Sequence, residues 1–248
     1  MNIVPFSFTG NRKTIFAPGS VSSLSEEASF YGKRMILFTG GSSLKKRGVL
    51  ARIEASLKKD GFDYPIYSID SEPEPDTVDR ITAENTGTRP DVIAAVGGGS
   101  VIDAGKAVSA MLCEDGLISE YLEGIGNKTP SGRKIPFIAV PTTAGTGSEA
   151  TSNAVMRKLG PDGFKKSLRH FNYTPEIAVI DPELYSGCPP SIAAASGMDA
   201  LSQLIEAYIS VKSTFFTDIH VLGAIDAIFE ALPVVSGGKG DEDFCDSA

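Results

Sequence analysis

Three consecutive glycines, Gly97–Gly99, and the serine that follows them, Ser100, form the stretch of this sequence best suited to chemistry. They come directly after the unbroken apolar run Val92–Val96 and before a helical pattern with apolar residues spaced by three and four. Glycines let a ligand approach the backbone closely, and the first turn of a helix offers free N–H groups and partial positive charge. The pattern therefore predicts a strand, a tight turn and a helix that receives a phosphate, with Ser100 and Asp103 in a capping-box relation.

The glycine turn does not by itself identify the ligand. A Walker A loop needs Gly-x-x-x-x-Gly-Lys-Ser/Thr, whereas here Gly105-Lys106 is followed by alanine and Ser100 stands in place of the first glycine. The dinucleotide fingerprint Gly-x-Gly-x-x-Gly also fails, because Ile102 occupies the position of its third glycine. A glycine-rich turn without a ligand is the alternative at this point.

Composition is that of an ordinary globular protein and excludes several functions. The 248 residues are 42% apolar and 22% charged, and the net charge of −8 leaves no basic run longer than Lys45–Arg47. We therefore expect no nucleic-acid partner. Three widely spaced cysteines without a C-x-x-C motif indicate reduced thiols in a cytoplasm rather than a disulfide framework. We find no secretory signal and no apolar run long enough for a bilayer, so no membrane partner is expected.

Alternating strands and helices are expected to position the glycine turn. Strands are predicted over residues 34–39, 64–69, 92–96, 135–140 and 177–180, helices over 20–31, 44–60, 77–87 and 101–112, and a short hairpin within 3–16. Such alternation predicts an α/β fold with a parallel, Rossmann-like sheet and helices on both faces. Ligands collect at the carboxyl ends of such strands, where the small and polar clusters Gly40–Ser43, Gly97–Ser100 and Thr142–Glu149 fall.

The character of the sequence changes after Asp181. Helical patterns follow over residues 191–211 and 214–232, and no further strand is predicted. We expect an α/β domain over residues 1–185 and the start of an all-helical domain over 186–248. Because two helices make a poor independent core, we expect this second domain to be incomplete within the 248 residues.

Three motifs, in this order, resemble the iron-containing (group III) alcohol dehydrogenases. They are Ala95–Lys106, Pro141–Thr151, and Asp181–Leu184 taken together with Gly197–Tyr208. The resemblance covers essentially the whole chain. It implies an N-terminal dinucleotide-binding domain, a C-terminal helical domain, a divalent metal, and hydride transfer between NAD(P)H and a small aldehyde or alcohol. It also implies a homodimer.

The resemblance implies cofactor-binding roles at the matching positions. Gly98, Gly99 and Ser100 are expected to hold the pyrophosphate, with Asp103 close by. Further cofactor contacts are implied for Thr142, Thr143, Thr146, Thr151, Lys165 and Tyr185. Structural alternatives exist, since Ser100 and Asp103 can cap the helix, threonines can bond local backbone, and Lys165 can be a solvated charge.

Gly40 bears on which form of the cofactor is used. Members of the family that prefer NAD often place an acidic residue here, which bonds a ribose hydroxyl and repels a 2′-phosphate. In this sequence Gly40 is followed by Ser42, Ser43 and Lys45, whose hydroxyl and ammonium groups suit a phosphate. We expect NADP to be accepted and preferred over NAD.

The metal site departs from the family pattern. Fe²⁺ or Zn²⁺ in such a site polarises the substrate oxygen. The resemblance makes Asp199 the first ligand and places Gln203 where the family has a histidine, and an amide oxygen is a weaker donor than imidazole. The only histidines, His170 and His220, match neither remaining ligand position. We expect this chain to bind little or no metal.

The main interpretation is therefore an NAD(P)-dependent alcohol dehydrogenase or aldehyde reductase of this family. The alternative is a nucleotide-binding fragment or pseudoenzyme that lacks a functional metal site and turnover. A P-loop kinase or ATPase is disfavoured because the Walker pattern fails.

Overall fold

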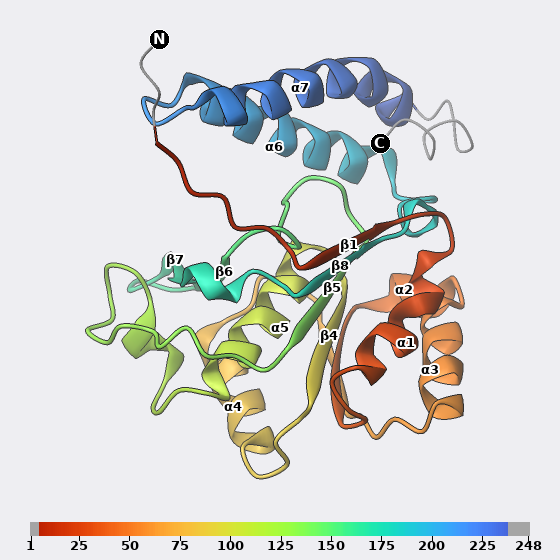
Figure 1. Cartoon of the computed structure of the whole chain (residues 1–248), viewed down its shortest axis with the longest axis vertical. Coiled ribbons are helices and arrows are strands. Elements are labelled where there is room, and N and C mark those ends of the chain that lie inside the picture. Colours follow the sequence, from red (N-terminus) through yellow and green to blue (C-terminus); the bar gives the residue numbers. More distant parts are fainter. Residues whose placement is uncertain (1–4, 238–248) are drawn as a thin grey trace. The chain divides into compact units, whose positions relative to one another are not determined.

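The computed structural model of the protein describes residues 5–237 (Figure 1). The chain divides into two compact units. The α/β unit comprises residues 10–142 and 148–181, and the helical unit comprises the described residues of 1–9, 143–147 and 182–248. Each unit is described by itself below.

A six-stranded sheet forms the centre of the α/β unit, in the order β1-β8-β5-β4-β2-β3. Every neighbouring pair is parallel, which confirms the predicted parallel α/β fold. The strands are β1 (Lys13–Phe16), β2 (Met35–Gly40), β3 (Ile66–Ile69), β4 (Val92–Gly97), β5 (Phe137–Pro141) and β8 (Ile177–Ile180). The central strands β2, β4 and β5 are buried along nearly their whole length, as continuous apolar runs in a parallel sheet require.

Helices cover both faces of this sheet, with α1 and α3 on one face and α4 and α5 on the other (Figure 1). The α-helices of the unit are α1 (Leu24–Ser29), α2 (Ser42–Lys46), α3 (Val49–Lys59), α4 (Pro75–Asn85) and α5 (Gly99–Met111). Short 3₁₀ turns are η1 (Ser20–Ser23), η2 (Ile118–Tyr121) and η3 (Phe171–Tyr173). Helix α5 lies so close to the sheet that a Cβ on Gly105 would be 2.8 Å from Phe137 Cε2. Its residues from Val101 to Met111 are all buried.

Two predictions of secondary structure in this unit are wrong. The hairpin expected within residues 3–16 is absent from residues 5–16, because Lys13–Phe16 pairs in parallel with the distant strand Ile177–Ile180. The single helix expected over 44–60 is instead α2 and α3, separated at Gly48, whose φ of 70° lies in the left-handed region.

An antiparallel pair of strands, β6 (Asn153–Lys158) and β7 (Phe164–Arg169), was not predicted. It packs against α5, and the turn between the strands carries Gly160 at a φ of 106°. The sequence Gly-Pro-Asp-Gly at residues 160–163 was an available turn signal between these segments.

Two long helices dominate the helical unit: α6 (Pro190–Ile209) and α7 (Phe215–Ser236), preceded by the 3₁₀ turn η4 (Pro182–Leu184). Both helices were predicted and pack against each other. At the start of α7, the ring of Phe216 stacks on Phe6 with centroids 5.0 Å apart.

Helix α7 differs from the expectation that no apolar stretch reaches bilayer length. By length and composition alone it could cross a membrane, and 6% of its most apolar stretch is buried. A core helix of a soluble protein passes the same test, so one such helix is weak evidence for a membrane span.

Candidate functional site

The carboxyl ends of four neighbouring strands lie at one edge of the sheet, and Gly40–Ser43, Gly97–Ser100 and Thr142 lie at these strand ends. The register pairs Gly40 with Ile69, Thr39 with Val96 and Gly97 with Pro141. The segments that follow these strands therefore leave the same edge of the sheet. In particular, Thr142 follows β5 and its N–H donates to Gly97 O at 3.0 Å.

The glycine turn joins β4 to α5 at this edge. Gly98 is the N-cap residue, with φ −71° and ψ −178°, and no side chain caps the helix. Ser100 lies one residue inside the helix, so the predicted capping by Ser100 is wrong. A Cβ on Gly97 would lie 2.5 Å from Val101 Cγ2, which explains the need for glycine where strand and helix meet. The first turn of α5 presents its backbone N–H groups at the edge where phosphates bind in such folds.

Asp103, in α5, does not complete a capping box, because its carboxylate accepts a hydrogen bond from strand β6. Asp103 Oδ2 accepts a hydrogen bond from the backbone N–H of Val155 on β6 at 3.0 Å. Among the described residues Asp103 Oδ1 has no hydrogen-bond partner, and it lies 3.9 Å from Lys106 Nζ. Burial raises the pKa of the Asp103 carboxyl, and the charge of Lys106 opposes this rise.

Lys106 is the buried cation of the site, with 1% of its surface exposed. Its Nζ donates to the carbonyl oxygens of Ser148 at 2.7 Å, Thr151 at 2.9 Å and Asn153 at 2.8 Å. The same atom lies 3.1 Å from Thr151 Oγ1. Burial lowers the pKa of Lys106 to about 8, although Asp103 and Glu149 act to raise it. Lys106 therefore fastens the segment 148–153 to α5.

This role of Lys106 was not predicted from the sequence. The available signal was a lysine three residues after an aspartate in an otherwise apolar helix. Such a cation must find oxygen partners when the helix is buried, because a buried charge without them is very unfavourable.

The α/β unit contains ten of the predicted cofactor residues. Gly40, Ser42, Ser43, Gly98, Gly99, Ser100 and Thr142 follow β2, β4 or β5 at the same edge, Asp103 lies in α5, Thr151 is held by Lys106, and Lys165 lies in β7. Thr143, Thr146 and Tyr185 belong to the helical unit. The roles of all thirteen residues stay predictions.

Lys165 is engaged on the surface by a carboxylate. Its Nζ forms an ion pair with Glu72 Oε1, and Glu72 Oε2 lies 3.1 Å from Arg157 on β6. The hydrogen bond from Lys165 is the main cause that lowers the pKa of Glu72. This ion-paired triad joins the β6–β7 pair to the segment before α4.

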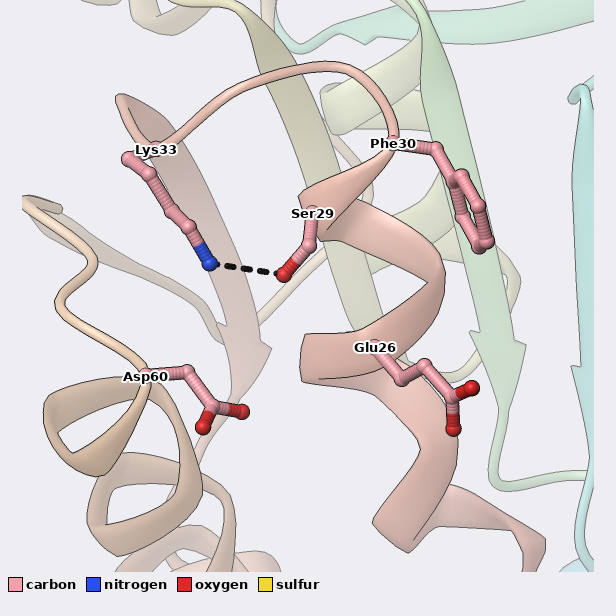
Figure 2. Close-up of a pocket in the computed structure, with 5 residues that line it drawn as sticks. All are labelled: Glu26, Ser29, Phe30, Lys33 and Asp60. Atoms are coloured by element: carbon pink, nitrogen blue, oxygen red, sulfur yellow. Dashed lines mark hydrogen bonds between the residues drawn. The ribbon is translucent and has the colours of Figure 1, made fainter.

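A pocket elsewhere in the α/β unit has no part in this arrangement. Glu26, Ser29, Phe30, Lys33 and Asp60 line an open pocket of about 430 Å³. Figure 2 shows these side chains and the hydrogen bond that Lys33 Nζ donates to Ser29 Oγ, which is 2.8 Å long. Lys33 lies two residues before β2, so this pocket lies at the amino edge of the sheet, opposite the glycine turn.

The predicted metal residues, Asp199 and Gln203, both lie on α6 and are exposed. Gln203 Nε2 approaches Gly145 O at 3.5 Å. Within residues 5–237 no three His, Cys, Asp or Glu side chains gather in a group that could hold a metal ion. One carboxylate and one amide do not fit a resident Fe²⁺ or Zn²⁺. Low metal content stays a prediction, and metal analysis of the purified chain tests it.

Comparison with known proteins agrees with the motifs. The family description "Iron-containing alcohol dehydrogenase" matches residues 11–182, and "Fe-containing alcohol dehydrogenase family, C-terminal" matches residues 193–245. The chain is 35% identical over 226 residues to a probable alcohol dehydrogenase EutG of Escherichia coli, covering 90% of this chain and 56% of that protein. It is 33% identical over 226 residues to an NADPH-dependent butanol dehydrogenase of Clostridium saccharobutylicum, covering 91% of this chain and 57% of that protein.

A solved structure extends the likeness to the fold. An NADH-dependent butanol dehydrogenase A of Thermotoga maritima superposes with a TM-score of 0.88 at 26% identity, covering 98% of this chain and 60% of that one. The chain thus spans somewhat more than half the length of these relatives. Because the first family description alone covers most of the sequence, the chain belongs to the iron-containing alcohol dehydrogenase family.

Proposed function

We propose that this chain supplies the cofactor-binding part of an enzyme that transfers hydride between NAD(P)H and a small alcohol or aldehyde. The observation that carries the proposal is the first turn of α5, which opens at the carboxyl edge of the sheet directly after the glycine turn. Membership of the alcohol dehydrogenase family supports the reaction class. Names of relatives such as butanol dehydrogenase support a short alcohol or aldehyde as the substrate.

In this proposal the residues of the α/β unit bind and orient the cofactor. The backbone N–H groups of Gly99 and Ser100 bind the pyrophosphate, which the helix N-terminus favours electrostatically. Thr142 and Thr151 contact the neighbouring phosphates and ribose. Lys106 acts indirectly, because it holds the segment that carries Thr151. No step of the reaction is assigned to a metal, since the described residues do not fit one.

The preference for NADP over NAD is part of the proposal. Gly40 leaves the end of β2 without an acidic side chain, while Ser42, Ser43 and Lys45 follow it. The relatives include an NADPH-dependent and an NADH-dependent butanol dehydrogenase, so both forms of the cofactor are reasonable ligands. A cytoplasmic location and a homodimeric assembly also belong to the proposal.

A charge at position 100 tests the pyrophosphate site without weakening the helix. An acidic residue in the first turn stabilises a helix by about 0.3–1 kcal/mol, but it repels a bound pyrophosphate. We expect Ser100→Glu to keep the Tm of the chain and to weaken NADPH binding at least tenfold in a fluorescence titration. Ser100→Gln adds the same bulk without the charge and is expected to lose less affinity.

Turnover is tested by NAD(P)H oxidation with a panel of short aldehydes, with and without added Fe²⁺ or Zn²⁺. Aldehyde-dependent oxidation supports the whole proposal. Cofactor binding without turnover limits the function of this chain to nucleotide binding. Binding of ATP in place of both nicotinamide cofactors contradicts the proposal.

A further inference from the structure

Asp70 lies at the carboxyl edge of the sheet, and the family motifs give its carboxylate no role. This residue directly follows β3, whose Ile69 pairs with Gly40 of β2. Asp70 and Gly41 therefore leave adjacent strands side by side. A Cβ built on Gly41 would lie 2.7 Å from Asp70 Oδ1, so the carboxylate lies against the bare backbone of Gly41.

The carboxylate of Asp70 is free to act on a ligand. The side chain is exposed, and its Oδ1 accepts a hydrogen bond from Ser68 Oγ at 3.2 Å. No lysine or arginine within the described part of the chain forms an ion pair with it. Asp70 thus presents a negative charge and open acceptor positions beside the end of β2.

The order of the strands indicates which part of a dinucleotide would meet this charge. Strand β2 lies between β4, which leads into the glycine turn, and β3, which leads into Asp70. When the pyrophosphate binds at the glycine turn, the adenosine ribose lies over the end of β2. In such folds an acidic residue at that place accepts hydrogen bonds from the ribose hydroxyls and repels a 2′-phosphate. In this chain the end of β2 has only Gly40 and Gly41, and the nearby acidic group comes from β3.

We propose that Asp70 is the residue that discriminates between NAD(H) and NADP(H), taking the place of the acidic side chain that β2 lacks. This inference rests on the proposed function, because it requires a nicotinamide dinucleotide at the glycine turn. The carboxylate accepts the ribose hydroxyls of NAD(H) and repels the 2′-phosphate of NADP(H). The hydroxyl and ammonium groups of Ser42, Ser43 and Lys45 favour binding of the 2′-phosphate, and the negative charge of Asp70 disfavours it. Asp70 therefore limits the preference for NADP(H). Gly41 is needed here because a side chain at that position would displace the carboxylate.

The test compares the wild-type chain with Asp70→Asn, which has the same shape and no charge. The measured quantity is the ratio of NADPH to NADH affinity, from fluorescence titration at low salt, or the ratio of kcat/KM where turnover is seen. A unit charge a few ångströms from a phosphate in water changes a binding constant by roughly fivefold to tenfold. We expect Asp70→Asn and Asp70→Ser to raise the ratio by about that factor, and the rise to shrink in 0.5 M salt.

Asp63→Asn is the matched control. It makes the same change in net charge at the other end of the β3 segment, roughly 20 Å from Asp70 in an extended chain. Its affinity ratio is expected to equal that of the wild type. An unchanged ratio in Asp70→Asn, with both cofactors bound by the wild type, overturns the role of Asp70 and leaves the proposed function intact. Failure of the wild type to bind either cofactor overturns the proposed function itself.

Discussion

Lys106 is the residue on which the arrangement of the candidate site most depends. A protonated amine has three N–H groups, and Lys106 has four oxygen atoms within hydrogen-bond distance on the segment 148–153. Three of these atoms are backbone carbonyl oxygens that accept hydrogen bonds from Lys106. The buried charge is thereby paired with the segment that carries Thr151.

Removal of this ammonium should loosen the segment. Lys106→Met keeps most of the aliphatic chain, but it leaves the buried carbonyl of Ser148 and the partly buried carbonyls of Thr151 and Asn153 without this donor. A fully buried group left without its donor costs about 1–3 kcal/mol, and a partly buried group costs less. We expect the free energy of unfolding in urea to fall by about 2–4 kcal/mol and amide hydrogen exchange to increase over residues 148–153. Lys166→Met replaces an exposed side chain of β7 and should change stability by less than about 0.5 kcal/mol. Unchanged exchange over this segment in Lys106→Met would contradict the role of Lys106.

The low pKa of Lys106 also predicts how stability depends on pH. Its pKa is about 8 in the folded chain and 10.5 ordinarily, so between these values the unfolded chain binds more protons. The contribution of Lys106 to the free energy of unfolding therefore rises with pH across this window. The charges of Asp103 and Glu149 raise the pKa of Lys106, and those of Lys134 and Arg169 lower it.

Urea unfolding of the wild type and Lys106→Met at pH 7.5, 8.5 and 9.5 measures this effect. Because most other titrations are common to both proteins, their difference isolates the lysine. The stability advantage of the wild type should widen as pH rises. A constant difference would show that Lys106 keeps an ordinary pKa.

Among the elements, the β4–turn–α5 unit was the part most accessible from sequence. An unbroken apolar run, three glycines and a helical spacing are local patterns, and they predicted the strand, the turn and the buried face of the helix. Cap geometry was not accessible, because the carboxylate of Asp103 bonds Val155, which is 52 residues away. The partner strand of β1 is likewise distant in sequence, at residues 177–180. Local patterns report burial and turns, whereas such pairings depend on tertiary contacts.

The same limit applies to the candidate site. The glycine turn and the polar clusters after β2 and β5 were predicted from local composition. The roles assigned to Asp70 and Lys106 were not predicted, because both depend on tertiary contacts. Asp70 lies against the backbone of Gly41, and Lys106 binds the segment 148–153.

The close contact between Gly97 of β4 and Val101 of α5 can be tested by substituting both residues. A methyl group added at Gly97 would lie 2.5 Å from Val101 Cγ2, inside van der Waals contact. Gly97→Ala should lower the free energy of unfolding by about 1–3 kcal/mol and weaken NADPH binding, since the first turn of α5 is displaced. Val101→Gly removes the opposing methyl groups and also Val101 Cβ, which would lie 2.6 Å from the added methyl group, so the double substitution should recover part of the loss. Additive effects in this double-mutant cycle would contradict direct contact as the cause.

For the molecule as a whole, the apolar surface of α6 and α7 is the feature with the largest physical consequence. Several large apolar side chains of these helices are exposed, among them Ile209 at 70%, Phe215 at 78% and Phe229 at 64%. Exposed apolar side chains in this number favour association with another apolar surface. A single exposed side chain such as Phe30, at 77%, is ordinary on a soluble protein.

We therefore expect the 248-residue chain to self-associate as its concentration rises, which sedimentation velocity measures. Replacing Ile209 and Phe229 together by lysine should shift the equilibrium towards the monomer, because charged groups resist burial in an apolar contact. Phe30→Lys removes one exposed ring of the α/β unit and should leave the equilibrium unchanged. Co-sedimentation with neutral phosphatidylcholine vesicles tests whether α7 binds lipid instead. A chain that binds vesicles and stays monomeric without them would show that α7 prefers lipid. A chain that remains monomeric and does not bind vesicles would show that the apolar faces of α6 and α7 are covered in solution.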